Sequence, residues 1–298
     1  MVKMHYAEMS GFMSFGDRRD GRRVRTLPAM SVVSPYIMDL RCDSQNYLTD
    51  SVKINEVEKY LNQKKADGYK GISLMHVIIA AYIRTVSQMP AINRFIAGQR
   101  VYSRPDIIVS LVIKREMSLE SPDTAIKVRF SPDATIEDVY NKFNETIESY
   151  RENPGGDFDK IAGILNAMPG LILRSTIRFL RFLDYFGVMP SIIEKISPFH
   201  SSMFITSMGS LGIPPIYHHL YNFGNVPLFI SFGAKKRVNE LADDGSVEKN
   251  SYMDITFVMD ERICDGYYFA AAYKYMKKYF KNPELLDSVP EKVLCDIK

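Results

Sequence analysis

The residues at positions 260–266, Asp-Glu-Arg-Ile-Cys-Asp-Gly, bring carboxylates, a guanidinium and a thiol together in one short segment. Carboxylates suit proton transfer and a thiol suits nucleophilic attack. The segment follows a run of β-branched and aromatic residues, 255–258, and precedes a helix-like stretch, so the sequence predicts strand, tight turn and helix. Such turns often carry catalytic side chains because the scaffold fixes them. The alternative interpretation is a surface turn with solvated charges.

The thiol of Cys264 is a weak candidate nucleophile. The carboxylate of the adjacent Asp265 raises, rather than lowers, the pKa of a thiol, and the thiolate is the attacking species. The sequence therefore does not favour chemistry at Cys264.

Three histidines are candidates for other roles. His76 lies in an apolar stretch, and we interpret it as a core histidine with a satisfied ring nitrogen. His218 and His219 are adjacent, so on a strand they face opposite ways and one of them points inward. No carboxylate or cysteine has a ligand-like spacing beside them, so we predict no metal site.

The segment 260–266 resembles the D-H-R-x-x-D-G signature of the catalytic domain of 2-oxo acid dehydrogenase acyltransferases (the E2 components). It also resembles the H-x-x-x-D-G motif of chloramphenicol acetyltransferases, which share that fold. Asp260, Arg262, Asp265 and Gly266 match the pattern. The position of the catalytic histidine holds Glu261 instead, so the resemblance is incomplete at the base.

A second segment, 203–212 (MFITSMGSLG), resembles the F-T-I-S-x-L-G-x-x-G stretch of the same family. The resemblance gives Thr206 the role of the hydroxyl that stabilises the tetrahedral oxyanion, with Ser207 as the alternative. A threonine hydroxyl can donate one hydrogen bond to such an oxyanion. By the same resemblance we assign Ser207, Gly209 and Gly266 to cofactor binding. Without its partner motif, this segment reads as a strand and a glycine turn.

The arginine-rich residues 17–25 (DRRDGRRVR) have two interpretations. One is a solvated arm. The other follows from the resemblance, in which an N-terminal arginine pairs with the aspartate that corresponds to Asp265. Arg22 is nearest to that place, with Arg23 and Arg25 as alternatives, and a charge-assisted pair would brace the turn.

The resemblance implies an α/β fold, a two-layer sandwich with a mixed β-sheet flanked by helices, as in chloramphenicol acetyltransferase. It implies coenzyme A or acyl-CoA as cofactor, an acyl-CoA or acyl-carrier thioester as partner, and a homotrimer with its active site at the subunit interface. The reaction would move an acyl group between a thioester and a thiol or hydroxyl acceptor. A glutamate with a pKa near 4.3 is a weak base for a thiol near 8.5, so the base is Glu261 or one of His218 and His219. The alternative is a catalytically inactive homologue that binds, assembles or docks.

The elements that position these residues follow from periodicity and from turn signals. Helices are predicted at 53–66, 73–88, 136–151 and after Gly266, and strands at 36–49, 106–117, 124–130 and 227–233, with a strand and a glycine turn over 203–212. A polar hairpin is predicted over 238–250. Either Asp133 or Thr135 caps the helix that starts at residue 136.

The stretch 159–197 is apolar, aromatic and basic, with Arg174, Arg178 and Arg181 near one helical stripe. It is either a pair of helices packed on the domain or an interfacial helix, with a membrane or protein contact through 171–196. We divide the chain into an N-terminal arm (1–20), an acyltransferase-like domain (21–282, with a helical insert at about 157–197) and a loose C-terminal tail (283–298).

Bulk composition bounds the remaining possibilities. A net charge of +3 is too small to predict a nucleic-acid partner. Three cysteines, an odd number, favour a reducing cytoplasm over a disulfide framework. We see no apolar segment typical of a signal peptide or a transmembrane helix, so the expected location is cytoplasmic.

Overall fold

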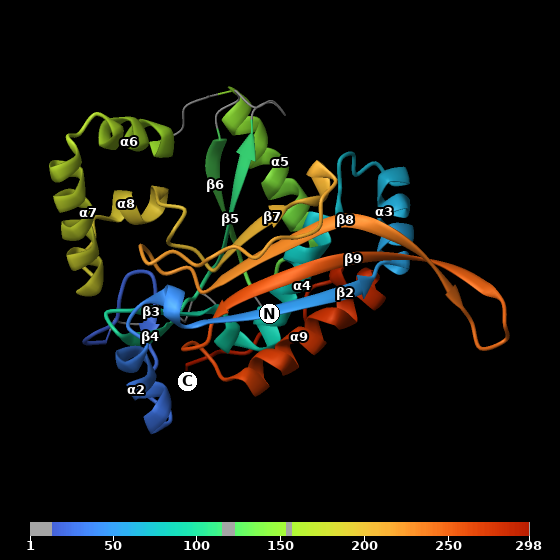
Figure 1. Ribbon diagram of the computed structural model, residues 1–298, viewed down its shortest axis with the longest axis horizontal. Coiled ribbons are helices and arrows are strands. Elements are labelled where there is room, and N and C mark those ends of the chain that lie inside the picture. The colour runs from blue at the N-terminus through green and yellow to red at the C-terminus, as the bar shows by residue number, and fades with distance from the viewer. Residues whose placement is uncertain (1–13, 115–122, 153–156, 298) are drawn as a thin grey trace.

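The computed structural model describes residues 14–114, 123–152 and 157–297 (Figure 1). Its centre is a six-stranded mixed sheet with the strand order β2-β9-β8-β7-β5-β6. The strands are β2 (Gln45–Lys53), β5 (Ile107–Lys114), β6 (Asp123–Phe130), β7 (Met203–Ser207), β8 (Leu228–Leu241) and β9 (Val247–Asp260). Strand β7 is parallel to both of its neighbours, and the other pairs are antiparallel.

Helices cover one face of this sheet (Figure 1). They are α3 (Asn55–Ala66), α4 (Leu74–Gln88), α5 (Ile136–Glu152) and α9 (Gly266–Lys281). Helix α4 is buried on nearly all sides, as its uninterrupted apolar sequence predicted. The side chains of Ile205, Ile230 and Phe257 point from the sheet into the same core as α4. The predicted two-layer α/β sandwich is confirmed.

The helix caps agree with the sequence. Thr135 caps α5, because its hydroxyl accepts from the Asp138 amide at 3.3 Å while the Asp138 carboxylate accepts from the Thr135 amide at 2.8 Å. His76 is a buried core residue, and its Nδ1 accepts from the Ser73 amide at 3.1 Å at the start of α4. Both interpretations made from the sequence are confirmed.

The prediction of a strand over 36–49 is wrong in its first half. Helix α2 (Ala29–Ile37) and the short 3-10 helix η1 (Arg41–Asp43) precede β2, which begins at Gln45. Only Tyr36 and Ile37 of α2 fall within the predicted strand, and the rest of this helix was not predicted. The turn at η1 instead carries the buried side chain of Arg41 toward Asp260.

A small three-stranded sheet lies beside the main one and is formed by β1 (Arg22–Arg23), β4 (Arg100–Ser103) and β3 (Arg94–Ala97). The preceding residues are not the solvated arm that one interpretation expected. Arg18 and Asp20 are buried and paired at 2.8 Å, and Arg18 also contacts Asp184 of the helical insert at 2.6 Å. Buried charges of this kind persist only when they are paired.

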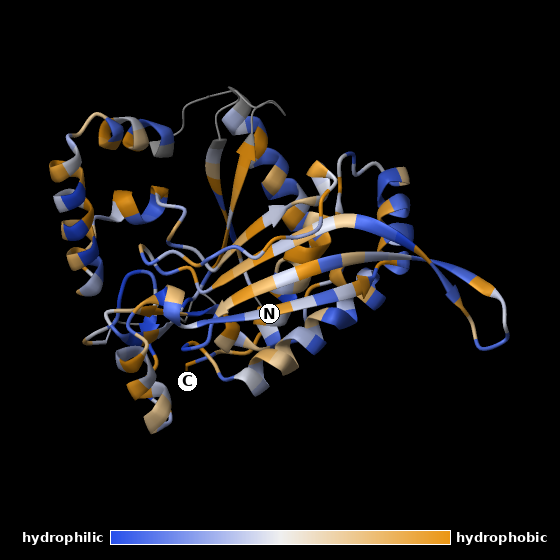
Figure 2. Cartoon of the chain, viewed as in Figure 1, coloured by the Kyte–Doolittle hydropathy of each residue, from blue (hydrophilic) through white to orange (hydrophobic). Residues whose placement is uncertain are grey.

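The insert forms three helices rather than the expected pair: α6 (Asp157–Asn166), α7 (Gly170–Tyr185) and α8 (Ser191–Ile196). They lie at the opposite end of the molecule from α3 (Figure 1). Apolar and polar residues alternate along α7 (Figure 2). The buried Asp184 fixes the end of α7 to Arg18.

The C-terminal segment is held in place, so its interpretation as a loose tail is wrong. After the short helix η4 (Pro283–Leu286), the Leu294 amide donates to the Ser87 carbonyl at 2.8 Å. Asp296 accepts two hydrogen bonds from Arg94, at 2.7 and 2.8 Å. The partners lie about 200 residues away in the sequence, so local patterns could not predict this anchoring.

Strands β8 and β9 continue beyond the helical layer as a long hairpin (Figure 1). The hairpin predicted over 238–250 is confirmed, and its tip includes Gly245, which has a φ of +80°. Glycine adopts this left-handed conformation without steric cost.

Candidate functional site

The turn after β9 is held by a buried ion-pair cluster. The Asp260 side chain is fully buried and accepts from Arg262 Nε at 2.8 Å and Nη2 at 2.7 Å. Arg41 lies 3.4 Å from the same carboxylate, and the Ser44 hydroxyl lies 3.3 Å from it. Arg262 also donates to the Met38 carbonyl at 2.7 Å. These contacts give Asp260 and Arg262 a structural role in fixing the turn.

The other motif residues of this turn are more accessible. Glu261 is half-buried, and its amide donates to the Ser44 carbonyl at 2.9 Å. Burial raises the pKa of the Cys264 thiol to about 12, so the thiol is protonated at neutral pH. Asp265 is the N-cap of α9, where its carboxylate accepts from the Tyr268 amide at 2.8 Å. Gly266 is the first residue of that helix and faces open space.

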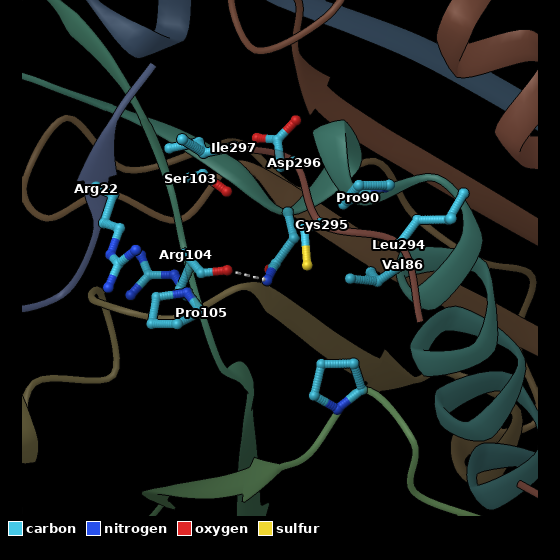
Figure 3. A pocket seen from close by; sticks show the side chains of 12 residues that line it. Arg22, Val86, Pro90, Ser103, Arg104, Pro105, Leu294, Cys295, Asp296 and Ile297 are labelled. Atoms are coloured by element: carbon cyan, nitrogen blue, oxygen red, sulfur yellow. Dashed lines mark hydrogen bonds between the residues drawn. The ribbon is translucent and has the colours of Figure 1, made fainter. Parts of the chain in front are cut away.

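The arginines of the N-terminal segment lie on or next to β1. Arg22 is level with Ser103 of β4 and lines a small pocket whose residues Figure 3 shows. Arg23 is level with Tyr102, and Arg25 donates to Asp17 at 3.1 Å. The pairing of Arg22 with Asp265 stays a prediction.

Arg94 is a residue that sequence reasoning missed. It is level with Ser103 on the other side of β4. It binds Asp296 bidentately and lies 3.4 Å from the carbonyl of Ile263, within the motif turn. Arg94 therefore ties the turn to the C-terminal segment. No local signal could have found it, because both partners are distant in sequence.

Thr206 lies on the sheet face that points away from α4. Along β7 the side chains alternate, so Ile205 enters the core while Phe204 and Thr206 point to the opposite face. The register places Thr206 level with Ser231 of β8 and Thr256 of β9. A row of hydroxyl side chains therefore crosses this face. The Ser231 hydroxyl is buried and has no hydrogen-bond partner within the part of the chain that the structure describes.

The residues after Thr206 form a close turn against β8. The Ser207 carbonyl accepts from the Ser210 hydroxyl at 2.9 Å. A Cβ at Gly209 would lie 2.7 Å from the carbonyl oxygen of Gly233, so only glycine fits this approach without a shift of the backbone.

The loop 213–220 crosses the same face and brings His218 onto it. The His218 ring stacks on the Phe229 ring, with centroids 4.3 Å apart and an interplanar angle of 6°. Its Nδ1 lies 3.1 Å from the Ile216 carbonyl, which can only accept, so Nδ1 carries the proton and Nε2 is the basic nitrogen. Burial lowers the pKa of His218, which favours the neutral ring. His219 is exposed, and its ring centroid lies 4.9 Å from that of Tyr221. The two histidines lie on a loop and not on a strand, so the opposite orientation stays a prediction.

The register decides which candidates lie near one another within one chain. Glu261 follows Thr256 by five residues, or roughly 17 Å along the strand direction. Strands β7 and β9 are separated by two strand spacings of about 4.8 Å, at right angles to that direction. Together the two displacements put the Cα atoms of Thr206 and Glu261 roughly 19 Å apart. Thr206 is instead a diagonal neighbour of Phe229, at about 7–8 Å between Cα atoms. Within one chain, Thr206 therefore lies on the same sheet face as the Phe229 ring on which His218 stacks, and far from Glu261.

A cavity of about 260 Å³ lies beside the motif turn. Arginines of three separate segments line it, namely Arg41, Arg181 and Arg262, together with Asp39 and Asp184. Within the described ranges no three side chains of His, Cys, Asp or Glu gather closely enough to hold a metal ion. No helix in those ranges is long and apolar enough to cross a membrane.

Comparison with solved structures places the fold. The chain is similar to a probable dihydrolipoamide acetyltransferase from Listeria monocytogenes, with a TM-score of 0.54 and 12% identity over 88% of this chain and 95% of that one. It is also similar to a truncated catalytic core of the 2-oxoacid dehydrogenase multienzyme complex from Thermoplasma acidophilum, with a TM-score of 0.52 and 12% identity over 87% and 98%.

A third similar structure is the dihydrolipoamide acetyltransferase of Azotobacter vinelandii, with a TM-score of 0.50 and 11% identity over 89% of this chain and 94% of that one. No protein-family model matches the sequence, and no curated protein sequence matches it significantly. At these identities the likeness establishes the fold. The resemblance inferred from the two motifs is thereby confirmed at the level of the catalytic-domain fold, and the replacement of the catalytic histidine is a separate question.

Proposed function

We propose that this protein is a coenzyme A-dependent acyltransferase that moves an acyl group from a thioester to a thiol or hydroxyl acceptor, with His218 as base and Thr206 as oxyanion donor. The observation that carries the proposal is the stacking of His218 on Phe229, one strand away from Thr206 on the same sheet face. A base and a hydroxyl donor on one rigid surface are what acyl transfer needs.

The proposed reaction uses the tautomer that the Ile216 carbonyl favours. His218 Nε2 takes the proton of the acceptor thiol or hydroxyl as its sulfur or oxygen attacks the thioester carbonyl carbon. The Thr206 hydroxyl donates to the oxyanion of the tetrahedral intermediate. The carbon–sulfur bond then breaks, and the imidazolium returns its proton to the departing coenzyme A thiolate. The ordinary pKa of an imidazole, about 6.5, lies closer to that of a thiol, about 8.5, than the pKa of a carboxylate, about 4.3, does. Burial lowers the pKa of His218 below its ordinary value, which keeps the ring neutral and able to accept a proton.

Glu261 enters this scheme only across a subunit interface. Since it lies roughly 19 Å from Thr206 within one chain, it can act on the same thioester only when a second copy supplies it. We propose the homotrimer of the family resemblance as that arrangement, with the active site between subunits. Arg22 would then brace the turn through Asp265.

Coenzyme A would approach along Ser207, Gly209 and Gly266, the positions assigned from the motifs. The cavity beside the turn suits its phosphates because the exposed Arg181 lines it and a guanidinium group can bind phosphate oxygens bidentately, whereas the buried Arg41 and Arg262 are paired with Asp260. Saturable binding of coenzyme A, weakened by Arg181→Gln, would support this placement.

The test is turnover of acyl-CoA, followed by the release of free thiol, in four single variants. We expect His218→Gln to lower kcat by about 10²–10⁴-fold and Thr206→Val to lower it by about 10²–10³-fold. His219→Gln is the matched control and retains activity, because that side chain is exposed. Unchanged turnover in His218→Gln, with a loss in Glu261→Gln, would transfer the role of base to Glu261. Binding of coenzyme A without turnover would establish the inactive homologue.

A second function, docking on an anionic membrane through 171–196, is favoured by the outer face of α7. Five apolar side chains there are more than half exposed: Leu171, Ile172, Phe179, Phe182 and Phe186. Arg174, Arg178 and Arg181 flank them, and the one acidic residue of α7, Asp184, is buried. A basic helix with an exposed apolar stripe is typical of interfacial binding.

Flotation with vesicles tests this docking. We expect binding to vesicles that contain anionic phospholipid and none to neutral vesicles. Replacement of the three arginines by glutamine should abolish the binding. Equal flotation of this triple variant would exclude the arginines from the binding. No flotation of the wild-type chain with anionic vesicles would refute a membrane role and leave a protein partner for the stripe.

A further inference from the structure

We infer that the helical insert holds a fatty acyl chain in an apolar cavity separate from the proposed transfer site. The cavity has a volume of about 500 Å³. All three helices of the insert contribute to its walls, with Ile161 and Leu165 from α6, Ile177 and Leu180 from α7, and Ile193 and Ile196 from α8. The two α7 residues, Ile177 and Leu180, are half-buried and so differ from the exposed apolar residues of the same helix.

The chemistry of the lining excludes polar ligands. Its two polar side chains are Thr176 and Ser197, and both already have partners. The Thr176 hydroxyl contacts the Met168 sulfur at 3.9 Å, and the Ser197 hydroxyl accepts from the Phe199 amide at 3.3 Å. A nucleotide, sugar or peptide would lose hydrogen bonds to water without replacement here. Only an apolar group gains from entering.

The size of the cavity fits a long chain rather than a short acyl group. A cavity of about 150 Å³ lined by similar side chains holds one benzene molecule, so about 500 Å³ has room for on the order of 15–20 carbon atoms. An acetyl group would leave most of this space empty. Ligand pockets of this size are typical of molecules that bury most of their surface.

A buried lysine lies behind one wall of the cavity. Lys127 Nζ donates to the backbone carbonyls of Glu194 and Ser197, each at 2.9 Å, and Ser197 lines the cavity. Burial lowers the pKa of Lys127 to about 7, so the apolar lining, and not a fixed charge, carries the inference.

A row of aromatic rings links the cavity to the sheet face that carries His218. Phe199 lines the cavity and contacts Tyr221 at 4.7 Å between ring centroids. The centroid of the Tyr221 ring lies 6.4 Å from that of Phe204, and the Phe204 centroid lies 5.2 Å from that of Phe229. Phe229 in turn stacks with His218. Chain binding does not depend on the transfer reaction. The rings pack against one another, so the row connects the cavity wall to the proposed base through contacts.

The test is binding of a fluorescent long-chain fatty acid to the full chain, with competition by saturated fatty acids of 8 to 18 carbons. We expect one saturable site and an affinity that rises about three- to fourfold for each added methylene until the cavity is full. Competition by the matching acyl-CoA separates a free fatty acid from a thioester as the source of the chain. No acyl transfer is measured, so failure here and failure of the proposed function are distinguishable.

Leu180→Trp fills the cavity and should weaken binding at least tenfold. Phe179→Trp is the matched control, because it places the same side chain on the exposed face of the same helix, and we expect less than a twofold change. The wild-type chain contains no tryptophan, so the emission of each variant also reports its folding. If Leu180→Trp does not fold, Ile193→Phe narrows the opposite wall and should shorten the preferred chain by a few carbons. Unchanged binding in folded Leu180→Trp, an unchanged length preference in Ile193→Phe, or no saturable site would overturn the inference.

Discussion

Replacing Asp260 by asparagine tests whether the motif turn is held by its buried charges. The substitution keeps the size of the side chain and removes its charge. Arg262 would lose the acceptor of one of its two hydrogen bonds, at 2.7 and 2.8 Å, together with the opposite charge, and Arg41 would lose its neighbouring carboxylate at 3.4 Å. Both guanidinium groups are almost fully buried, so water cannot replace the carboxylate without opening the turn.

The magnitude follows from the cost of an uncompensated buried charge. Breaking a buried pair by removing one partner costs about 3–5 kcal/mol, whereas an exposed pair contributes about 0–1 kcal/mol. We therefore expect Asp260→Asn to lower the free energy of unfolding by about 3–5 kcal/mol. Adding Arg262→Gln should recover part of this loss, because the second variant removes one of the unpaired charges.

Urea unfolding followed by circular dichroism measures the effect, at one fixed protein concentration because self-association would shift the transition. Glu56→Gln is the control. It breaks a 2.8 Å pair with Lys59 whose side chains are 52% and 73% exposed, and it should change stability by less than about 0.5 kcal/mol. A loss below about 1 kcal/mol in Asp260→Asn would refute the structural role assigned to the pair.

Three further predictions concern His76, Cys264 and Gly209. Burial lowers the pKa of His76 from 6.5 to about 4, so the folded chain binds fewer protons than the unfolded chain between these values and loses stability as pH falls through them. His76→Gln keeps an acceptor for the helix cap but has no group that titrates in this range. Urea unfolding at pH 7 and pH 4 should show that the variant loses about 3 kcal/mol less stability than the wild-type chain over this range. Equal losses of stability in the two proteins would contradict the burial effect. Cys264 should react with iodoacetamide at pH 8 at least about tenfold more slowly than the exposed Cys42, as peptide mass spectrometry of a time course would show, and equal rates would exclude the raised pKa. Gly209→Ala should lower the free energy of unfolding by about 1–3 kcal/mol, because its Cβ would meet the Gly233 carbonyl at 2.7 Å. Wild-type stability would mean that the turn after β7 can move away from β8.

Much of the fold could be predicted because periodicity is a local property. The apolar stretch of α4, the amphipathic α5 and the turn at Asp244-Gly245 each carry their signal within a few residues. The segments that were predicted wrongly are those stabilised by contacts with residues far away in the sequence. Arg41 and the C-terminal segment find their partners far away in the sequence, so their own composition suggested neither burial nor anchoring.

The candidate site shows the same division. The two motifs identified the fold, and the adjacency of His218 and His219 predicted that one would point inward. The distance between Thr206 and Glu261 could not be predicted, since it depends on the register of three strands. A shift of register would move both residues without changing either motif.

The long hairpin of β8 and β9 bears on whether molecules of this protein pair through their strands. β7 pairs with β8 only as far as Phe232, and a β-bulge follows, so the residues beyond it present an edge to which no other described strand is hydrogen-bonded. An open edge invites pairing with a strand of another molecule and, eventually, aggregation. Three consecutive cationic residues occupy this edge, Lys235, Lys236 and Arg237. Lys235 pairs with Glu58 and Lys236 with Asp254, and such charged side chains along an open edge disfavour the addition of another strand.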